Sequence, residues 1–205
     1  NNMTLDSNRT NANGVYGGAI YQIAGTLTVN HSTFTNNSGT GGAIGRQNGT
    51  TTVNNSTFVG NTNPGPGSGA GGAIRFDNQT GGGFTINNST FSGNTSANAS
   101  AGAIWIQGFR TMSINNSTFS GNSSGILIDG TLNLRNSIIA NSALGIDCTL
   151  GGSGSIPINL NNLIENNVSC TSTFTGDPNL GPLQNNGGAT QTLALISPSN
   201  AINNG

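Results

Sequence analysis

The best candidates for catalytic residues in this chain of 205 residues are its six carboxylates. They are Asp6, Asp77, Asp129, Asp147, Glu165 and Asp177. A glycosidase needs two carboxylates that face each other across roughly 5–10 Å, and a lyase needs a calcium-binding cluster of carboxylates beside a basic residue. Only Asp77 and Asp129 occupy similar positions in the repeated pattern of the chain, and another repeat separates them. The chain has no lysine, and its single histidine, His31, replaces an asparagine of the repeat. We therefore expect no catalytic residues, no metal site, no cofactor and no enzyme activity.

A second set of residues favours binding rather than catalysis. Tyr21, Arg75 and Trp105 each follow an Ala-Ile pair. Alternate side chains of a β-strand point to opposite faces, so the residue after an inward isoleucine points outward. Exposed Tyr, Arg and Trp side chains can stack on sugar rings or on a protein partner. The sequence therefore predicts a ligand-binding strip of these three residues. The alternative is that they pack against one another beneath a loop.

Three short phrases that recur in a fixed order must position these residues. The first phrase is an apolar residue followed three positions later by asparagine: Leu5/Asn8, Phe34/Asn37, Phe58/Asn61, Phe91/Asn94, Phe119/Asn122 and Ile138/Asn141. The second is Gly-Gly-Ala-Ile or a close variant, at 17–20, 41–44, 71–74 and 101–104. The third is an alternating apolar pair before each Asn-Asn, such as Phe84 and Ile86. Recurring phrases in fixed order indicate a repeat architecture.

The spacing of the first phrase selects among repeat architectures. Successive apolar positions are 29, 24, 33, 28 and 19 residues apart. A helical solenoid does not absorb such variation, whereas a parallel β-helix places insertions in outer loops, here 63–70 and 78–83, as spacers or binding loops. The phrases are also β-branched or aromatic and alternate as strands do. We expect an all-β parallel β-helix with three short strands per coil and about five to six coils over residues 1–170. Residues 171–205 no longer repeat, and we expect them to form an irregular C-terminal cap over the open end.

Stacking of the coils would bring like residues into columns. The apolar positions Phe34, Phe58, Phe91 and Phe119 would form an internal aromatic stack. The asparagines of the first phrase would mark a corner and hydrogen-bond to one another from coil to coil. This predicts a structural ladder of Asn8, Asn37, Asn61, Asn94, Asn122 and Asn141.

Charge and cysteine content limit the partners and the compartment. Charged residues make up 5% of the chain and the net charge is −1, which gives no reason to expect nucleic acid or anionic lipid as a partner. No apolar run approaches the roughly 18 residues of a membrane-spanning segment. The two cysteines, Cys148 and Cys170, favour one disulfide made in an oxidising compartment, with two buried thiols as the alternative.

Two family resemblances follow from these residues. The alternation of Gly-Gly-Ala-Ile with Phe-x-x-Asn over residues 1–141 resembles the repeats of chlamydial polymorphic membrane proteins, which are surface adhesins with a β-helical passenger. The C-terminal phrases are more specific: Asp147-Cys148, Ser169-Cys170, Asp177-Pro178-Asn179-Leu180-Gly181-Pro182-Leu183 and Asn186-Gly187-Gly188-Ala189-Thr190-Gln191-Thr192. They look like the C-terminal half of secreted bacterial β-helix proteins that often carry a surface anchor. The resemblance implies a right-handed β-helix, export and a surface or matrix location, but no defined reaction.

The function expected from the sequence is therefore that of an extracellular structural protein. The repeats begin at Asn1 without a capping segment, so either residues before Asn1 are missing or another molecule covers the bare edge of the first coil. We expect subunits to stack head to tail into a fibre. The alternative function is an adhesin or carbohydrate-binding passenger that uses the strip of Tyr21, Arg75 and Trp105. A polysaccharide lyase or hydrolase is a distant third hypothesis.

Overall fold

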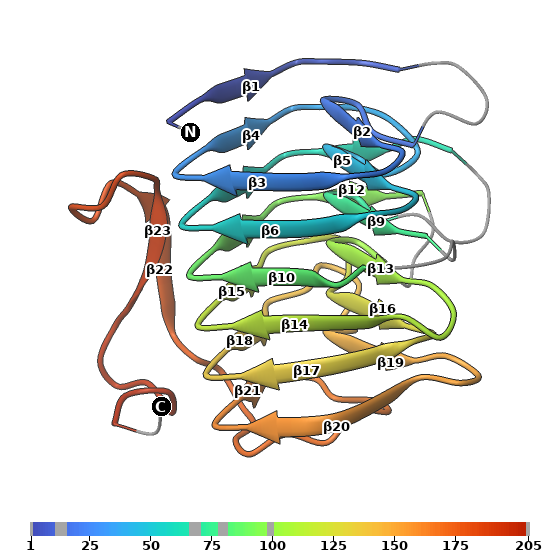
Figure 1. The fold of residues 1–205 in the computed structure, drawn as a ribbon. Coiled ribbons are helices and arrows are strands. Elements are labelled where there is room, and N and C mark those ends of the chain that lie inside the picture. The colour runs from blue at the N-terminus through green and yellow to red at the C-terminus, as the bar shows by residue number, and fades with distance from the viewer. Residues whose placement is uncertain (1, 11–15, 66–70, 78–81, 98–100, 204–205) are drawn as a thin grey trace.

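The computed structural model describes residues 2–10, 16–65, 71–77, 82–97 and 101–203. Within this part the chain contains strands and no α-helix, and the strands follow one another in triplets that stack in parallel, one coil upon the next (Figure 1). The strands nearest the viewer in Figure 1 run leftward while the chain descends from the N-terminus, so the coil is right-handed. The protein is thus a parallel β-helix, as the sequence predicted. Most of the two expected insertion loops lies outside the described residues.

Each repeated phrase builds one wall of the β-helix. The first phrase forms the first sheet: β1 (Thr4–Asp6), β4 (Thr33–Thr35), β7 (Thr57–Val59), β11 (Thr90–Ser92), β15 (Thr118–Ser120), β18 (Ile138–Ala140) and β21 (Leu163–Ile164). The second phrase forms the second sheet: β2 (Ile20–Gln22), β5 (Ile44–Arg46), β9 (Ile74–Phe76), β13 (Ile104–Ile106), β16 (Ile126–Ile128) and β19 (Cys148–Leu150). The third phrase forms the third sheet: β3 (Thr26–Asn30), β6 (Thr50–Asn54), β10 (Phe84–Asn87), β14 (Thr111–Asn115), β17 (Thr131–Arg135) and β20 (Ser155–Leu160). A short pair, β8 (Thr62–Asn63) and β12 (Thr95–Ser96), extends one corner.

The interior of the first sheet is an aromatic column. The rings of Phe34, Phe58, Phe91 and Phe119 are fully buried and stack with centroid separations of 4.6, 4.6 and 4.5 Å. Neighbouring ring planes are within 8° of parallel, because the parallel register sets each ring over its counterpart one coil away. Each buried ring contributes roughly 1.5–3 kcal/mol by the apolar area it removes from water.

Asparagine side chains form a hydrogen-bonded ladder at the corner after the first sheet. The Nδ2 atoms of Asn8, Asn37, Asn61 and Asn94 each donate to Oδ1 of the ladder asparagine one coil on, over 2.9 Å in all four cases. The same Oδ1 atoms also accept the backbone N–H of the preceding coil's asparagine. Asn37, Asn61, Asn94 and Asn122 are buried, so the three bonds among them join groups that lack water as a partner, whereas Asn8 at the first coil is exposed. The ladder therefore provides hydrogen-bond partners for the backbone and side-chain amide groups at this inner corner.

Asn141 lies outside this ladder, which corrects the sequence prediction. The parallel register pairs Phe119 with Ile139 rather than with Ile138, and Ile139 is the fully buried residue of the two. This register moves Asn141 into the left-handed corner position that Gly121 holds one coil earlier, with φ of 56° and 66°. Two adjacent isoleucines made the register ambiguous in the sequence, and a one-residue shift exchanges the inward and outward faces.

The interior near the N-terminal coils is polar in one column of the second sheet. Its third strand position holds Gln22 and Arg46 where later coils have Phe76, Ile106 and Ile128. The guanidinium of Arg46, which is fully buried, stacks 4.4 Å from the centroid of the Phe76 ring. Burial, and secondly the nearby charge of Arg110, lower the pKa of Arg46 to about 10.

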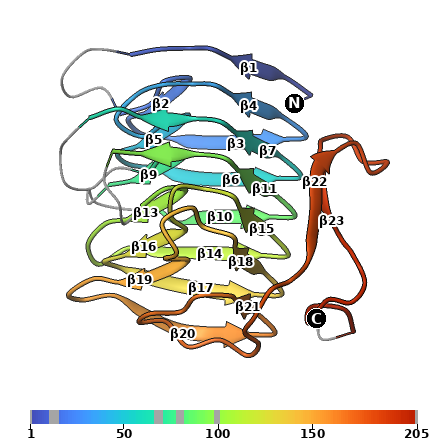
Figure 2. The ribbon, with the colours of Figure 1, turned by 180° about the vertical axis from the view of Figure 1, so that it is seen from behind.

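The C-terminal end of the rod is covered by a shorter segment than expected. The chain returns beneath β21, where Phe174 accepts the N–H of Ile164 over 3.1 Å and donates its own N–H to Asn162 over 2.9 Å. After Gly176 the chain leaves this end. The antiparallel pair β22 (Leu180–Gln184) and β23 (Thr192–Leu195) runs along the side of the coils, back towards the N-terminal end (Figures 1 and 2). Only the first residues of the predicted cap over 171–205 therefore cover the end.

A disulfide ties the returning segment to the last strand of the second sheet. Cys148 and Cys170 are bonded, with their Cα atoms 5.8 Å apart and a sequence separation of 22. Cys148 is fully buried and pairs in register with Ile126 of the preceding coil. The disulfide predicted from the sequence is thus present and joins the end cover to the core.

Removing this disulfide should loosen the end of the rod. For the Cys148→Ala/Cys170→Ala variant we expect the free energy of unfolding to fall by about 3 kcal/mol, because a closed loop of this length restricts the unfolded chain. Chemical denaturation of the oxidised wild type, the reduced wild type and the variant measures the change. Equal stability of all three proteins would show that the bond contributes nothing to the fold.

Candidate functional site

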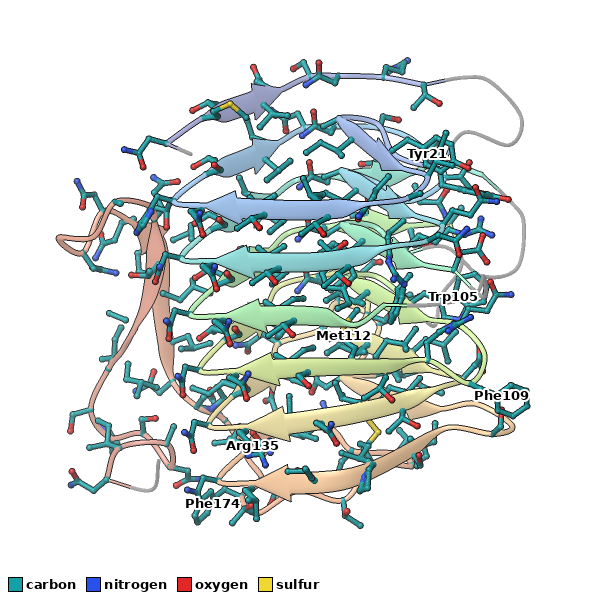
Figure 3. The ribbon with its side chains drawn as sticks, in the orientation of Figure 1. Tyr21, Trp105, Phe109, Met112, Arg135 and Phe174 are labelled. Atoms are coloured by element: carbon teal, nitrogen blue, oxygen red, sulfur yellow. A yellow bond between two sulfur atoms is a disulfide. The ribbon has the colours of Figure 1, made fainter. Side chains whose placement is uncertain are left out.

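The outer face of the second sheet holds a row of large side chains. The parallel register aligns Tyr21, Gly45, Arg75 and Trp105, the middle residues of β2, β5, β9 and β13. Each strand begins with an isoleucine that packs in or against the core, so these middle residues point outward. Figure 3 shows Tyr21 above Trp105 on the right-hand side of the molecule, with Phe109 farther down the same side. The structure thus brings all three predicted strip residues onto one face.

Tyr16 fills the gap that glycine leaves in this row. A Cβ atom at Gly45 would overlap the backbone and the Cβ atom of Tyr16, so only glycine fits beneath that residue. The Tyr16 ring packs edge-on against the Tyr21 ring, with centroids 5.4 Å apart. The hydroxyl of Tyr21 donates to Gln47 Oε1 over 3.0 Å. The sequence offered one signal for Tyr16, a glycine in a row of otherwise large residues.

Arg75 connects the two ends of the row. Its guanidinium carbon lies 4.0 Å from the centroid of the Tyr16 ring and 5.3 Å from that of Trp105. Nη2 of Arg75 forms an ion pair with Asp77 over 3.3 Å. The indole N–H of Trp105 donates to Oδ2 of Asp129 over 2.6 Å. Asp77 and Asp129, the two carboxylates expected at similar positions, therefore bind different partners, Arg75 and Trp105, in one continuous stack.

The stack differs from the open strip expected from the sequence. Trp105 is only 6% exposed, and the side chain of Arg75 is 14% exposed. Tyr16 and Tyr21 remain half-buried. Cation–π contacts and two carboxylates thus enclose the Arg and Trp side chains, as in the alternative of mutual packing. Period-two alternation places a residue on a face but does not show what covers it there.

The surroundings of Tyr21 disfavour its ionised form. Burial raises the pKa of the Tyr21 hydroxyl above its usual value; Tyr16 and Asp77 add to this effect, and Arg75 opposes it. Because the pKa of Tyr21 is higher in the folded state than in the unfolded chain, folding is favoured most while the hydroxyl is neutral in both states, below the ordinary tyrosine pKa of about 10. The contribution of Tyr21 to the free energy of unfolding is lost as the pH rises from there through the raised pKa.

The other carboxylates hold nearby backbone or side-chain groups. Asp147 is fully buried, and its two oxygens accept the backbone N–H groups of Ser142 and Asn166 over 3.2 and 2.8 Å. Oε2 of Glu165 accepts the N–H of Asn141 over 2.7 Å. No three His, Cys, Asp or Glu side chains come together among the described residues as they would to hold a metal ion.

A double-mutant cycle tests whether Tyr16 occupies the Gly45 position. Gly45→Ala should displace Tyr16 and lower the free energy of unfolding by about 2 kcal/mol, and Tyr16→Ala should cost a similar amount. The double variant should lose much less than the sum, because residue 16, once it lacks the ring that anchors it, is free to move away from the added methyl group. Urea denaturation of the four proteins measures the coupling. Additive losses would mean that the two residues do not share this space.

No protein-family model matches the chain, and neither a curated protein nor a solved structure matches it. No helix long and apolar enough to cross a membrane occurs in the part of the chain that the structure describes.

Proposed function

We propose that this protein is an exported structural component of a cell surface or extracellular matrix, in which the stacked coils act as a rigid rod. The hydrogen-bonded columns inside the rod carry this proposal. Beside the asparagine ladder, serines form a second inner column, in which the N–H of Ser32, Ser56 and Ser89 bonds to the serine Oγ one coil on, over 3.2 Å. Polar side chains thus serve to join coils.

The disulfide and the composition support the same proposal. A disulfide between Cys148 and Cys170 is compatible with an oxidising, extracellular compartment. The likeness of the C-terminal phrases to secreted bacterial β-helix surface proteins also supports it. Neutral Asn, Ser and Thr side chains, rather than charged ones, give such a surface its hydrogen bonds to water.

The single rod is the unit that we propose. Head-to-tail stacking through the first sheet needs a free edge on β21, but the N–H of Ile164 already bonds to Phe174. The second sheet is also engaged at this end, where the N–H of Leu150 donates to Ser169 Oγ over 2.7 Å. Stacking would have to displace this cover. We therefore expect electron microscopy at rising protein concentration to show lone particles, whereas filaments would establish head-to-tail stacking.

Cell fractionation tests the proposed location and redox state together. An antibody should find the protein in the surface or secreted fraction of the cells that make it. A maleimide reagent added during lysis should leave Cys148 and Cys170 unlabelled until a reductant is added. Protein found in the cytoplasm with two labelled thiols would contradict the proposal.

Adhesion through the stacked face is the second candidate function. The half-buried rings of Tyr16 and Tyr21, beside Arg75, favour it because they offer aromatic surface to a partner. Tyr21→Ala should then weaken binding on a glycan or host-protein array. Trp105→Phe serves as the control, because the enclosed indole offers little surface.

A further inference from the structure

The loop between β22 and β23 leans against a corner of the β-helix and leaves hollows on both sides of its contact. Thr57 donates its hydroxyl to the Gln191 carbonyl over 2.7 Å, and Thr190 donates to the Asn55 carbonyl over 3.2 Å. The loop reaches the level of the N-terminal coils, as the views from both sides show (Figures 1 and 2). The loop and the corner are therefore in direct contact, and these two hydrogen bonds fix the loop in place.

Two adjoining hollows form one groove at this contact. The hollow on one side, about 370 Å³, is lined by His31, Asn55 and Asn88 of the corner, by residues 188–190 of the loop and by Thr192 at the start of β23. The hollow on the other side, about 350 Å³, is lined by His31 and Ala189, by residues 2–4 before and at the start of β1, and by Thr33 of β4. His31 and Ala189 line both. Each hollow alone falls in the size range of small-ligand pockets.

The corner residues that line the groove share one backbone conformation. The equivalent position of each coil is left-handed, with φ between 48° and 57°, and holds Asn2, His31, Asn55, Asn88, Asn116, Asn136 and Asn161. Asparagine meets this backbone requirement in six of the seven coils, so the backbone does not demand a histidine. His31, the one residue of this column that is not asparagine, lines both hollows. We take this as a sign that the imidazole serves the groove rather than the fold.

Most of the side chains that line the groove are polar and neutral, beside Met3, Gly188 and Ala189, and the lining carries no carboxylate, lysine or arginine among the described residues. The Asn88 side chain is exposed and makes no hydrogen bond to any described residue. The Asn55 amide lies 3.4 Å from the His31 Nε2 atom, a long contact that an incoming hydroxyl group can replace. Amide, imidazole and threonine hydroxyl groups both donate and accept hydrogen bonds, as do the hydroxyl groups of sugars.

We propose that this groove binds a neutral oligosaccharide, with His31 and the Asn55 and Asn88 amides as its hydrogen-bonding groups and the β22–β23 loop as its wall. Charged ligands find no counter-charge in the described lining. Residues 186–192 form most of this loop. They make two hydrogen bonds to the β-helix, and the fold of the β-helix does not otherwise require them. This site does not depend on the structural role proposed above, so either proposal can fail without the other.

NMR titration of the full-length, disulfide-bonded protein tests the proposal. The probes are cellohexaose, xylohexaose, mannohexaose and chitohexaose, with an oligogalacturonate as the charged comparison. Because no Phe, Tyr or Trp ring lines the groove in the described part of the chain, we expect a dissociation constant on the order of 1 mM for at least one neutral probe. Shifts should concentrate on the side chains of His31, Asn55, Asn88 and Thr190. Absence of shifts with all four neutral probes at about 20 mM would overturn the proposal.

Matched variants separate the groove from non-specific binding. His31→Asn restores the residue of the other coils and should keep the fold, yet weaken binding at least about tenfold, because the shorter amide does not replace the imidazole where the two hollows meet. Asn116→Gly changes the same corner position outside the groove and should leave binding unchanged. Equal binding by wild type and His31→Asn, or shifts confined to Tyr16 and Tyr21, would also overturn the proposal.

Discussion

Replacing Asn94 by alanine should lower the free energy of unfolding by about 4 kcal/mol, because the substitution leaves several buried polar groups without partners. Oδ1 of Asn94 accepts both the backbone and side-chain N–H groups of Asn61, over 3.0 and 2.9 Å. Its Nδ2 donates to the Phe58 carbonyl over 3.0 Å and to Asn122 Oδ1 over 2.9 Å. Urea denaturation followed by circular dichroism measures the loss.

Asn87→Ala is the matched control for this variant. Asn87 belongs to an outer asparagine column and also makes two side-chain bonds of 2.9 Å, to Asn54 and Asn115. It is half-buried, so water can replace the lost partners, and we expect a loss of about 1 kcal/mol. Similar losses for both variants would mean that burial of the inner ladder is unimportant for stability.

Truncating Phe91 to alanine should cost about 4 kcal/mol, because it opens a cavity in the middle of the aromatic column. The ring is fully buried and stacks on Phe58 and Phe119 at 4.6 and 4.5 Å. Neighbouring coils hold those rings in place, so the structure cannot easily collapse into the space. Phe91→Leu should cost less, about 1.5 kcal/mol, because leucine fills most of the volume.

Phe109 provides the control for the aromatic column. It is 88% exposed at the corner between the second and third sheets (Figure 3), and Phe109→Ala should change the stability by less than about 0.5 kcal/mol. Thermal or urea denaturation of the three variants gives the comparison. A loss at Phe109 as large as that at Phe91 would contradict the inward and outward assignment of these residues.

The sequence predicted the β-helix because its repeats encode inward positions directly. Phe58 and Phe91 recur with the same neighbours, and parallel stacking then brings like residues together. Cys148 and Cys170 were the only cysteines, so their pairing left few alternatives. These features depend on local pattern, which a single sequence contains.

Features that depend on contacts between distant segments were not predictable in the same way. Trp105 follows the strand pattern, but its burial depends on Arg75 and on Asp129, which lies one coil away. Asn141 was misplaced because either Ile138 or Ile139 could face inward. The lateral position of the β22–β23 hairpin rests on contacts such as that of Thr57 with Gln191, which are 134 residues apart.

Hydrogen exchange of the asparagine side-chain amides tests most directly whether the inner ladder holds the coils together. NMR can follow the Nδ2 protons of Asn37, Asn61 and Asn94 against those of Asn54 and Asn87 in the outer column. We expect the inner protons to exchange on the order of 10³-fold more slowly, because they are released only when coils separate. Equally fast exchange of both sets would show that the ladder is open to water, and would contradict the account.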